Sequence, residues 1–230
     1  MKVGIQSWEL GRQSMSDADD NCEDIVDPTA VIGHSNFTEA LVSSMASGRM
    51  HHAWLLTGPR GIGKASAARL ASAWLLSEER RAAAPFINKL GGFSVLRSDP
   101  GSKLVFNGAH PDYLSIVPGL HDNKSGQIKI DQIRSMVPFM AHKPARGGYR
   151  VAVIDSMDEL NRSGANAMLK LLEEPPENTV IFLVSSRPAQ LPPTIRSRCR
   201  LIRLKALDAL SCRNVLMRVW PDADTEHVDL

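Results

Sequence analysis

Apolar runs and stretches with helical spacing alternate along the middle of this chain. The apolar runs lack polar alternation, which is typical of strands buried on both faces of a parallel sheet. They cover Ala53 to Thr57, Tyr113 to Val117, Arg150 to Asp155, Thr179 to Ser185 and Arg200 to Leu204. The helical stretches cover about Asn36 to Ser47, the residues leading to Leu76, Ile130 to His142 and Asn161 to Glu174. We therefore predict an α/β fold with a parallel five-stranded sheet flanked by helices.

Two stretches lie outside this alternation. Residues 1–27 are rich in acids and have little apolar periodicity, which predicts a flexible acidic leader ahead of a core domain at 28–206. Between Arg80 and His110, glycines and prolines interrupt the pattern, and no element is predicted there. A loop of this length in a compact domain is usually functional or mobile.

The first apolar run leads into a glycine-rich turn. Gly58, Gly63 and Lys64 match the pattern G-x-x-x-x-G-K ahead of an amphipathic helix. Glycines let backbone N–H groups turn inward around phosphate oxygens, the helix presents its positive end, and the lysine reaches the terminal phosphates. We expect a cradle for ATP or ADP, made by Gly58, Pro59, Arg60, Gly61, Ile62, Gly63, Lys64 and Ala65. The alternative is an ordinary glycine turn that caps a helix.

The cradle departs from a hydrolytic site at two positions. A serine or threonine normally follows the lysine and ligates magnesium, but here Ala65 follows it, and Ser66 is rotated by about 100° along the helix. Asp155 ends an apolar strand, as the magnesium-shell aspartate of such sites does, but Ser156 stands where a water-polarising glutamate often follows. The pattern favours nucleotide binding without hydrolysis. The alternative for Asp155 is a residue that caps a turn.

Two charged stretches have more than one interpretation. Glu173 and Glu174 lie at the predicted end of a helix, where the macrodipole disfavours acids, so either a basic partner or a solvated face explains them. From Ser185 to Leu207 there are several basic residues and no acid. That stretch either binds nucleic-acid phosphates, places an arginine against the nucleotide of another subunit, or faces solvent.

Composition narrows the classes of function. The net charge of +2 is too small to indicate nucleic-acid binding by itself, so such a contact must come from a local patch or a partner. The three cysteines, Cys22, Cys199 and Cys212, are far apart, and we expect neither a disulfide framework nor a zinc site. No apolar run is long enough to cross a membrane, and no signal-peptide core is present, so we expect a cytoplasmic protein.

Five segments together resemble the clamp-loader branch of the AAA+ ATPases, and within it the delta-prime type of bacterial DNA polymerase III subunit. They are HAWLLTGPRGIGKA (52–65), AHPDYL (109–114), IKIDQIR (128–134), NAMLKLLEEPPENTVIFLVSS (166–186) and LPPTIRSRCR (191–200). The LLEEPP block and the Ser-Arg-Cys triplet at 197–199 are the most specific of these. The resemblance extends over roughly 28–207.

The resemblance implies a RecA-like AAA+ P-loop domain in a hetero-pentameric clamp loader, which places a sliding clamp on primed DNA during replication. It implies that Arg198 of the triplet is an arginine finger, reaching in trans to ATP on a neighbouring subunit. Ala65 and Ser156 resemble the delta-prime pattern, in which the subunit's own site is not a working ATPase. The family commonly carries a four-cysteine zinc module between 80 and 110, but this stretch contains no cysteine, and no zinc is expected.

The family also continues into a small helical lid and a helical collar. We expect residues 207–230 to begin the lid and expect the collar to be absent from this sequence. Two other functions remain as alternatives. One is a catalytically active P-loop ATPase or kinase that uses Lys64 and Asp155, and the other is a stand-alone DNA-binding module, which the small net charge disfavours.

Overall fold

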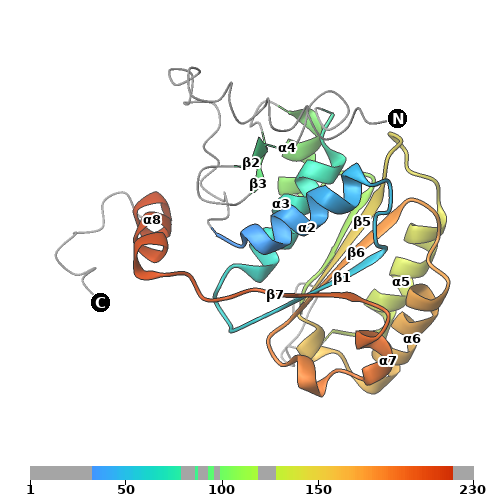
Figure 1. Cartoon of the computed structure of the whole chain (residues 1–230). Helices are drawn as coiled ribbons and strands as arrows, with labels where there is room; N and C mark the ends of the chain where they lie inside the picture. The colour runs from blue at the N-terminus through green and yellow to red at the C-terminus, as the bar shows by residue number, and fades with distance from the viewer. Residues whose placement is uncertain (1–32, 79–85, 88–92, 96–98, 119–127, 220–230) are drawn as a thin grey trace.

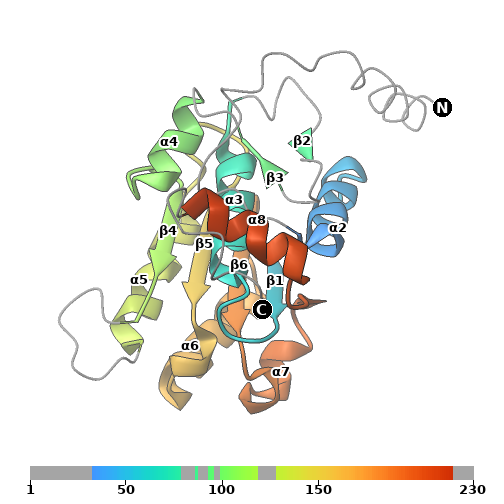
Figure 2. The same cartoon turned by 90° about the vertical axis from the view of Figure 1, so that its left-hand side faces the viewer.

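The computed structural model describes residues 33–78, 86–87, 93–95, 99–118 and 128–219. The predicted leader at 1–27 lies outside the described residues. A central sheet is flanked by helices (Figure 1, Figure 2). Its strands are β1 (Ala53–Thr57), β4 (Tyr113–Ile116), β5 (Arg150–Asp155), β6 (Thr179–Ser185) and β7 (Arg200–Arg203). The main helices are α2 (Ser35–Ala46), α3 (Lys64–Leu76), α4 (Pro100–Phe106), α5 (Ile130–Ala141), α6 (Arg162–Glu173), α7 (Pro193–Arg196) and α8 (Ala209–Val219).

The sheet contains five strands in the order β4-β5-β6-β1-β7, and every pairing is parallel. Ala53 lies opposite Ile181, and Trp54 lies opposite Arg200, so neighbouring strands begin at the same edge. Parallel strands need crossover connections, which helices supply here. The predicted α/β fold, with a parallel five-stranded sheet flanked by helices, is confirmed.

Alternate residues of the three inner strands, β5, β6 and β1, enter two different cores. On β1, Trp54 and Leu56 belong to the core that α2, α3 and α4 share, whereas Ala53 and Leu55 belong to the core that α5, α6 and α7 share. All four residues are fully buried. Burial of both faces explains why these three strands show no polar alternation in the sequence.

The stretch between Arg80 and His110, for which no element is predicted, contains α4 and a short antiparallel pair, β2 (Phe86–Ile87) and β3 (Phe93–Ser94). The Asp99 carboxylate caps α4 by accepting a hydrogen bond from the Ser102 N–H at 2.6 Å, and Pro100 opens the helix. An acidic N-cap followed by proline is a helix-start signal. The helix has only 7 residues, too few to show an apolar period.

The chain leaves β7 and enters α8, so a helix lies within the range 207–230 that is expected to begin the lid. Asp208 precedes this helix, and its Oδ1 accepts a hydrogen bond from the Ser211 N–H at 2.7 Å. Among the residues that the structure describes, no helix is both long and apolar enough to cross a membrane.

Gly101 generates a prediction about how α4 packs on α3. A Cβ atom at Gly101 would lie 2.4 Å from the backbone oxygen of Leu76, so an alanine must displace backbone. Although alanine ordinarily favours a helix, we expect Gly101→Ala to lower the free energy of unfolding by about 1–3 kcal/mol. Urea denaturation measures this change.

Gly164→Ala in α6 is the matched control. There the added Cβ would meet the end of the flexible Leu160 side chain, at 2.5 Å, which can move by rotating. This variant should be no less stable than the original chain, because alanine favours the helix. A Gly101→Ala variant as stable as Gly164→Ala would contradict the close packing of α4 on α3.

Candidate phosphate-binding cleft and arginine site

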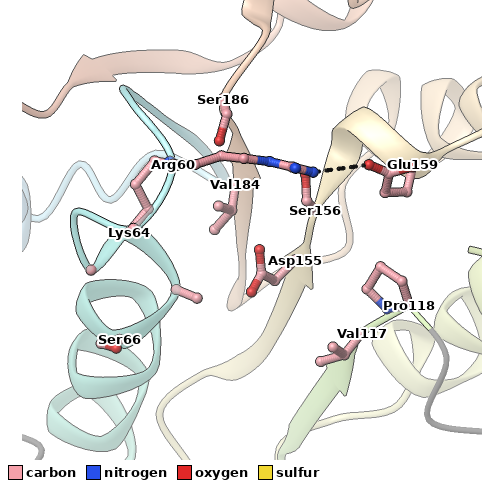
Figure 3. A pocket seen from close by; sticks show the side chains of 13 residues that line it. Arg60, Lys64, Ser66, Val117, Pro118, Asp155, Ser156, Glu159, Val184 and Ser186 are labelled. Atoms are coloured by element: carbon pink, nitrogen blue, oxygen red, sulfur yellow. Dashed lines mark hydrogen bonds and ion pairs between the residues drawn. The ribbon is translucent and has the colours of Figure 1, made fainter. Parts of the chain in front are cut away.

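The carboxyl ends of β1, β5 and β6 border a cleft of about 710 Å³. In open parallel sheets, ligands bind at this edge. The cleft lies beside the glycine-rich loop, as Figure 3 shows for its labelled side chains. Its lining consists of Arg60, Gly61, Gly63, Lys64, Ala65, Ser66, Val117, Pro118, Asp155, Ser156, Glu159, Val184 and Ser186.

The glycine-rich loop is folded around the Lys64 side chain. The Lys64 ammonium donates hydrogen bonds to the backbone oxygen of Gly58 at 2.9 Å and to that of Pro59. Gly58 has a φ of 149°, and a Cβ there would lie 2.5 Å from the backbone oxygen of Leu204. The loop therefore packs against the end of β7, and only glycine fits at this approach.

The structure brings most of the predicted cradle residues to the cleft. Arg60, Gly61, Gly63, Lys64, Ala65 and Asp155 line it, whereas Gly58, Pro59 and Ile62 do not. The last three support the loop through backbone atoms instead, since the Ile62 oxygen lies 2.7 Å from the His34 Nε2. Burial lowers the pKa of His34, although its contact with Ile62 acts in the opposite direction.

Asp155 and Lys64 both line the cleft, and their opposite charges attract each other. Burial raises the pKa of the Asp155 carboxyl, and the Lys64 charge opposes that change. Burial lowers the pKa of Lys64, while the charges of Asp158 and Asp155 oppose it. A phosphate would suit the Lys64 end of this pair, because the Lys64 residue is only 6% exposed and its ammonium is bound to neutral carbonyl groups.

The groups needed for magnesium-assisted hydrolysis are not assembled around this pair. Ala65 contributes a methyl group, and Ser66, which also lines the cleft, is exposed and set apart from Asp155 (Figure 3). The Ser156 hydroxyl is occupied, because it accepts a hydrogen bond from the Asp158 N–H at 3.2 Å. Within the described part of the chain, no cluster of three histidine, cysteine or acidic residues could hold a metal ion. The residues present suit phosphate binding better than hydrolysis.

Asp158 has a structural role that the sequence did not reveal. Its carboxylate accepts hydrogen bonds from the Ser185 hydroxyl at 2.5 Å, the Ser186 N–H at 2.7 Å and the Arg187 N–H at 3.2 Å. Burial alone would raise its pKa, but these hydrogen bonds outweigh burial and lower it. Asp158 thus fixes the end of β6, which forms one wall of the cleft.

Glu159 lies at the mouth of the cleft, and the sequence did not predict this role for it either. Its Oε1 lies 3.4 Å from the Arg60 Nη2 and 3.5 Å from the Arg187 Nη2. Figure 3 shows Arg60 extending from the loop across the cleft to reach it. No sequence pattern marks this position, because Glu159 follows the strand by several residues and reaches the cleft only through a short 3-10 helix (Met157–Glu159).

Arg198 lies at the edge of the sheet where the strands begin (the amino edge), whereas the cleft lies at the edge where the strands end (the carboxyl edge). Arg198 precedes Arg200, which pairs with Trp54 near the start of β1, whereas the glycine-rich loop follows Thr57 at the end of that strand. At a rise of about 3.3 Å per residue, the two ends of β1 are about 13 Å apart. Arg198 is therefore not part of the chain's own cleft.

Two acceptors of the same chain contact the Arg198 guanidinium. The Nη2 atom lies 2.9 Å from Oε1 of Glu173, and Nη1 donates a hydrogen bond to the backbone oxygen of Thr194 at 3.0 Å. The side chain is 35% exposed, so part of it faces solvent. Next to it, burial raises the pKa of the Cys199 thiol to about 12, which keeps that thiol protonated and inert.

Comparison with known proteins identifies relatives of this chain. Residues 33–208 match the family described as DNA polymerase III, delta subunit. The chain is 34% identical over 197 residues to DNA polymerase III subunit tau of Escherichia coli (strain K12), covering 86% of this chain and 28% of that protein. It is 34% identical over 192 residues to DNA polymerase III subunit delta' of Pseudomonas aeruginosa, covering 83% of this chain and 55% of that protein.

The crystal structure of a DNA polymerase III gamma-subunit-related protein from Thermotoga maritima has the same fold. It matches with a TM-score of 0.50 and 21% identity, covering 83% of this chain and 52% of that one. This chain thus spans about half the length of that protein and of the delta' relative, and about a quarter of the tau relative.

Asp158 generates a prediction about stability and pH. Because the folded pKa lies below the unfolded value, its contribution is present at neutral pH and is lost as the pH falls below about 4. We expect Asp158→Asn to lower the free energy of unfolding by about 1–2 kcal/mol at pH 7. The difference from the original chain should shrink between about pH 5 and pH 3.

Thermal unfolding across this pH range measures the effect. Asp131→Asn is the control, because the Asp131 side chain is 82% exposed and its ion pair with Arg134 contributes little. A loss of stability in Asp158→Asn that stayed constant down to pH 3 would mean that the carboxylate charge does not support the end of β6.

Proposed function

Because this chain belongs to the DNA polymerase III delta-subunit family of clamp-loader proteins, we propose that it acts as a delta-prime-like subunit of a sliding-clamp loader. In this role it is structural and supplies Arg198 as an arginine finger to ATP on a neighbouring subunit. Its own cleft holds any nucleotide, ATP or ADP, without hydrolysing it. No zinc takes part.

One observation carries the proposal: Arg198 and the chain's own cleft lie at opposite edges of the sheet. An arginine at the amino edge is out of reach of the cleft at the carboxyl edge, so it can serve a nucleotide only on another chain. A guanidinium is permanently charged and planar, which suits the charge on a transferring phosphoryl group. Partial exposure of Arg198 supports an interaction across a subunit boundary.

The residues that line the cleft support the proposal that this chain holds a nucleotide without hydrolysing it. The cleft retains Lys64 and the glycine-rich loop, which bind phosphate, but Ala65 and Ser156 replace the groups that usually hold magnesium and polarise water. Glu159, an acid that lines the cleft, is paired with Arg60 and Arg187. A paired carboxylate at the mouth of the cleft is a poor general base.

The proposed partners follow from the relatives. Proteins named as tau and delta' subunits of DNA polymerase III are each 34% identical to this chain. We propose that the chain joins other loader subunits in a hetero-pentamer and meets the sliding clamp and primed DNA as part of that complex. Its net charge of +2 supports DNA contact through the assembly rather than by this chain alone.

The non-hydrolysing cleft predicts that the isolated chain lacks magnesium-dependent ATPase activity. Phosphate release by the original chain and by Lys64→Ala should fall on the same background, because the lysine has no catalytic site to serve. Steady turnover that Lys64→Ala abolishes would favour the alternative function, an active P-loop ATPase or kinase.

Arg198→Ala should leave a reconstituted clamp loader assembled but reduce its DNA- and clamp-stimulated ATP hydrolysis. The loss should fall on the one nucleotide site that faces this subunit, by about 10³-fold or more at that site, as for other fingers supplied in trans. Site-resolved phosphate release, with the phosphate-loop lysines of the other nucleotide sites replaced by alanine, measures it.

Arg196→Ala is the matched control for this experiment. Arg196 lies two residues away, is exposed and carries the same charge, so a general loss of positive charge would affect both variants alike. Equal defects in the two variants, or unchanged hydrolysis in Arg198→Ala, would refute the finger assignment.

A further inference from the structure

Glu173, in the LLEEPP block, occupies a position that helix electrostatics disfavour. It is the last residue of α6, where the helix dipole presents its negative end and repels an acid. Its carboxylate lies 2.9 Å from the Arg198 guanidinium. Helix stability does not explain why an acid occupies this position. Its contact with Arg198, the candidate arginine finger, suggests that the reason lies in that contact.

Fold stability does not supply that reason. The Glu173 side chain is 48% exposed and that of Arg198 is 35% exposed. Ion pairs this close to solvent contribute little, because water screens them and because two long side chains must be immobilised. Removing the pair should therefore cost the fold little.

The contacts instead restrict where the Arg198 guanidinium lies. One nitrogen faces the end of α6 through Glu173, and another is bound to the Thr194 carbonyl of α7. The two helices are themselves fixed, since Ile195 and Leu172 are buried in the same core. A long, flexible side chain is thus held at two points, while the remaining N–H groups of the guanidinium stay available for a ligand.

We propose that Glu173 is the positioning residue of the arginine finger. It holds the Arg198 guanidinium at the amino edge of the sheet in the orientation from which it meets the neighbour's nucleotide. This inference rests on the proposed function of Arg198. Pre-orientation of a transition-state donor matters because displacement of a reacting group by about 1 Å can cost about 10²-fold in rate.

The neighbouring acid offers a matched control. Glu174 has the same charge, is exposed, and follows Glu173 at the same helix end, but no ion pair or side-chain hydrogen bond of Glu174 is found within the described part of the chain. Replacing either acid relieves the same unfavourable dipole interaction. Only Glu173→Ala releases Arg198.

The experiment uses a clamp loader in which only the nucleotide site facing this subunit is intact. Stimulated ATP hydrolysis is measured for Glu173→Ala, Glu174→Ala, Arg198→Ala and the double variant Glu173→Ala/Arg198→Ala. We expect Glu173→Ala to lower kcat by about 10- to 100-fold while KM for ATP stays unchanged. Glu174→Ala should match the original subunit, and the double variant should be no worse than Arg198→Ala, since both changes act through one side chain.

Glu173→Gln provides a second test, because it keeps an acceptor oxygen at the same reach and should retain more activity than Glu173→Ala. If Arg198→Ala is defective while Glu173→Ala matches Glu174→Ala, the finger stands and the positioning role is overturned. A kcat above the original in Glu173→Ala would overturn it as well, since Glu173 would then hold the finger back. Unchanged kcat in Arg198→Ala would remove the finger itself, and with it this inference.

Discussion

Parallel pairing of β1 with β6 and β7 places the carboxyl ends of these strands at one edge of the sheet and their amino ends at the other. The glycine-rich loop, Asp155 and Asp158 gather at the first edge because each follows or ends a strand. The triplet containing Arg198 lies at the second edge because it precedes β7. A single antiparallel strand would bring these two regions to the same edge.

The sequence predicted those parts of the fold whose signals are local. Apolar runs located the strands to within one residue, and in the three inner strands burial of both faces removes polar alternation. The loop pattern and Asp155 located the cleft because their signals are also local: the loop joins two consecutive elements, and Asp155 ends a strand. The sequence analysis missed α4. Asp99 and Pro100 form a clear start signal there, but the helix is too short to show a helical period of apolar residues.

Residues whose roles depend on distant partners could not be predicted. Asp158 binds groups 27 to 29 residues away along the chain, and Glu159 meets Arg60 at a separation of 99 residues. The misplaced charge of Glu173 did suggest a basic partner, but a solvated face was an equal alternative, and only the packing of α7 on α6 brings Arg198 to it. Local electrostatic rules show that such a residue is unusual, and tertiary structure identifies its partner.

The separation of cleft and arginine also constrains how copies of this fold can meet. If Arg198 serves a nucleotide at the carboxyl edge of a neighbour, then the amino edge of one subunit must face the carboxyl edge of the next. Such a head-to-tail contact joins two different surfaces, so it cannot close as a twofold dimer and instead generates a ring or an open arc. In an arc, the arginine at one end or the cleft at the other is left without a neighbour. A subunit whose own cleft lacks hydrolytic groups therefore fits the end at which only its arginine is used.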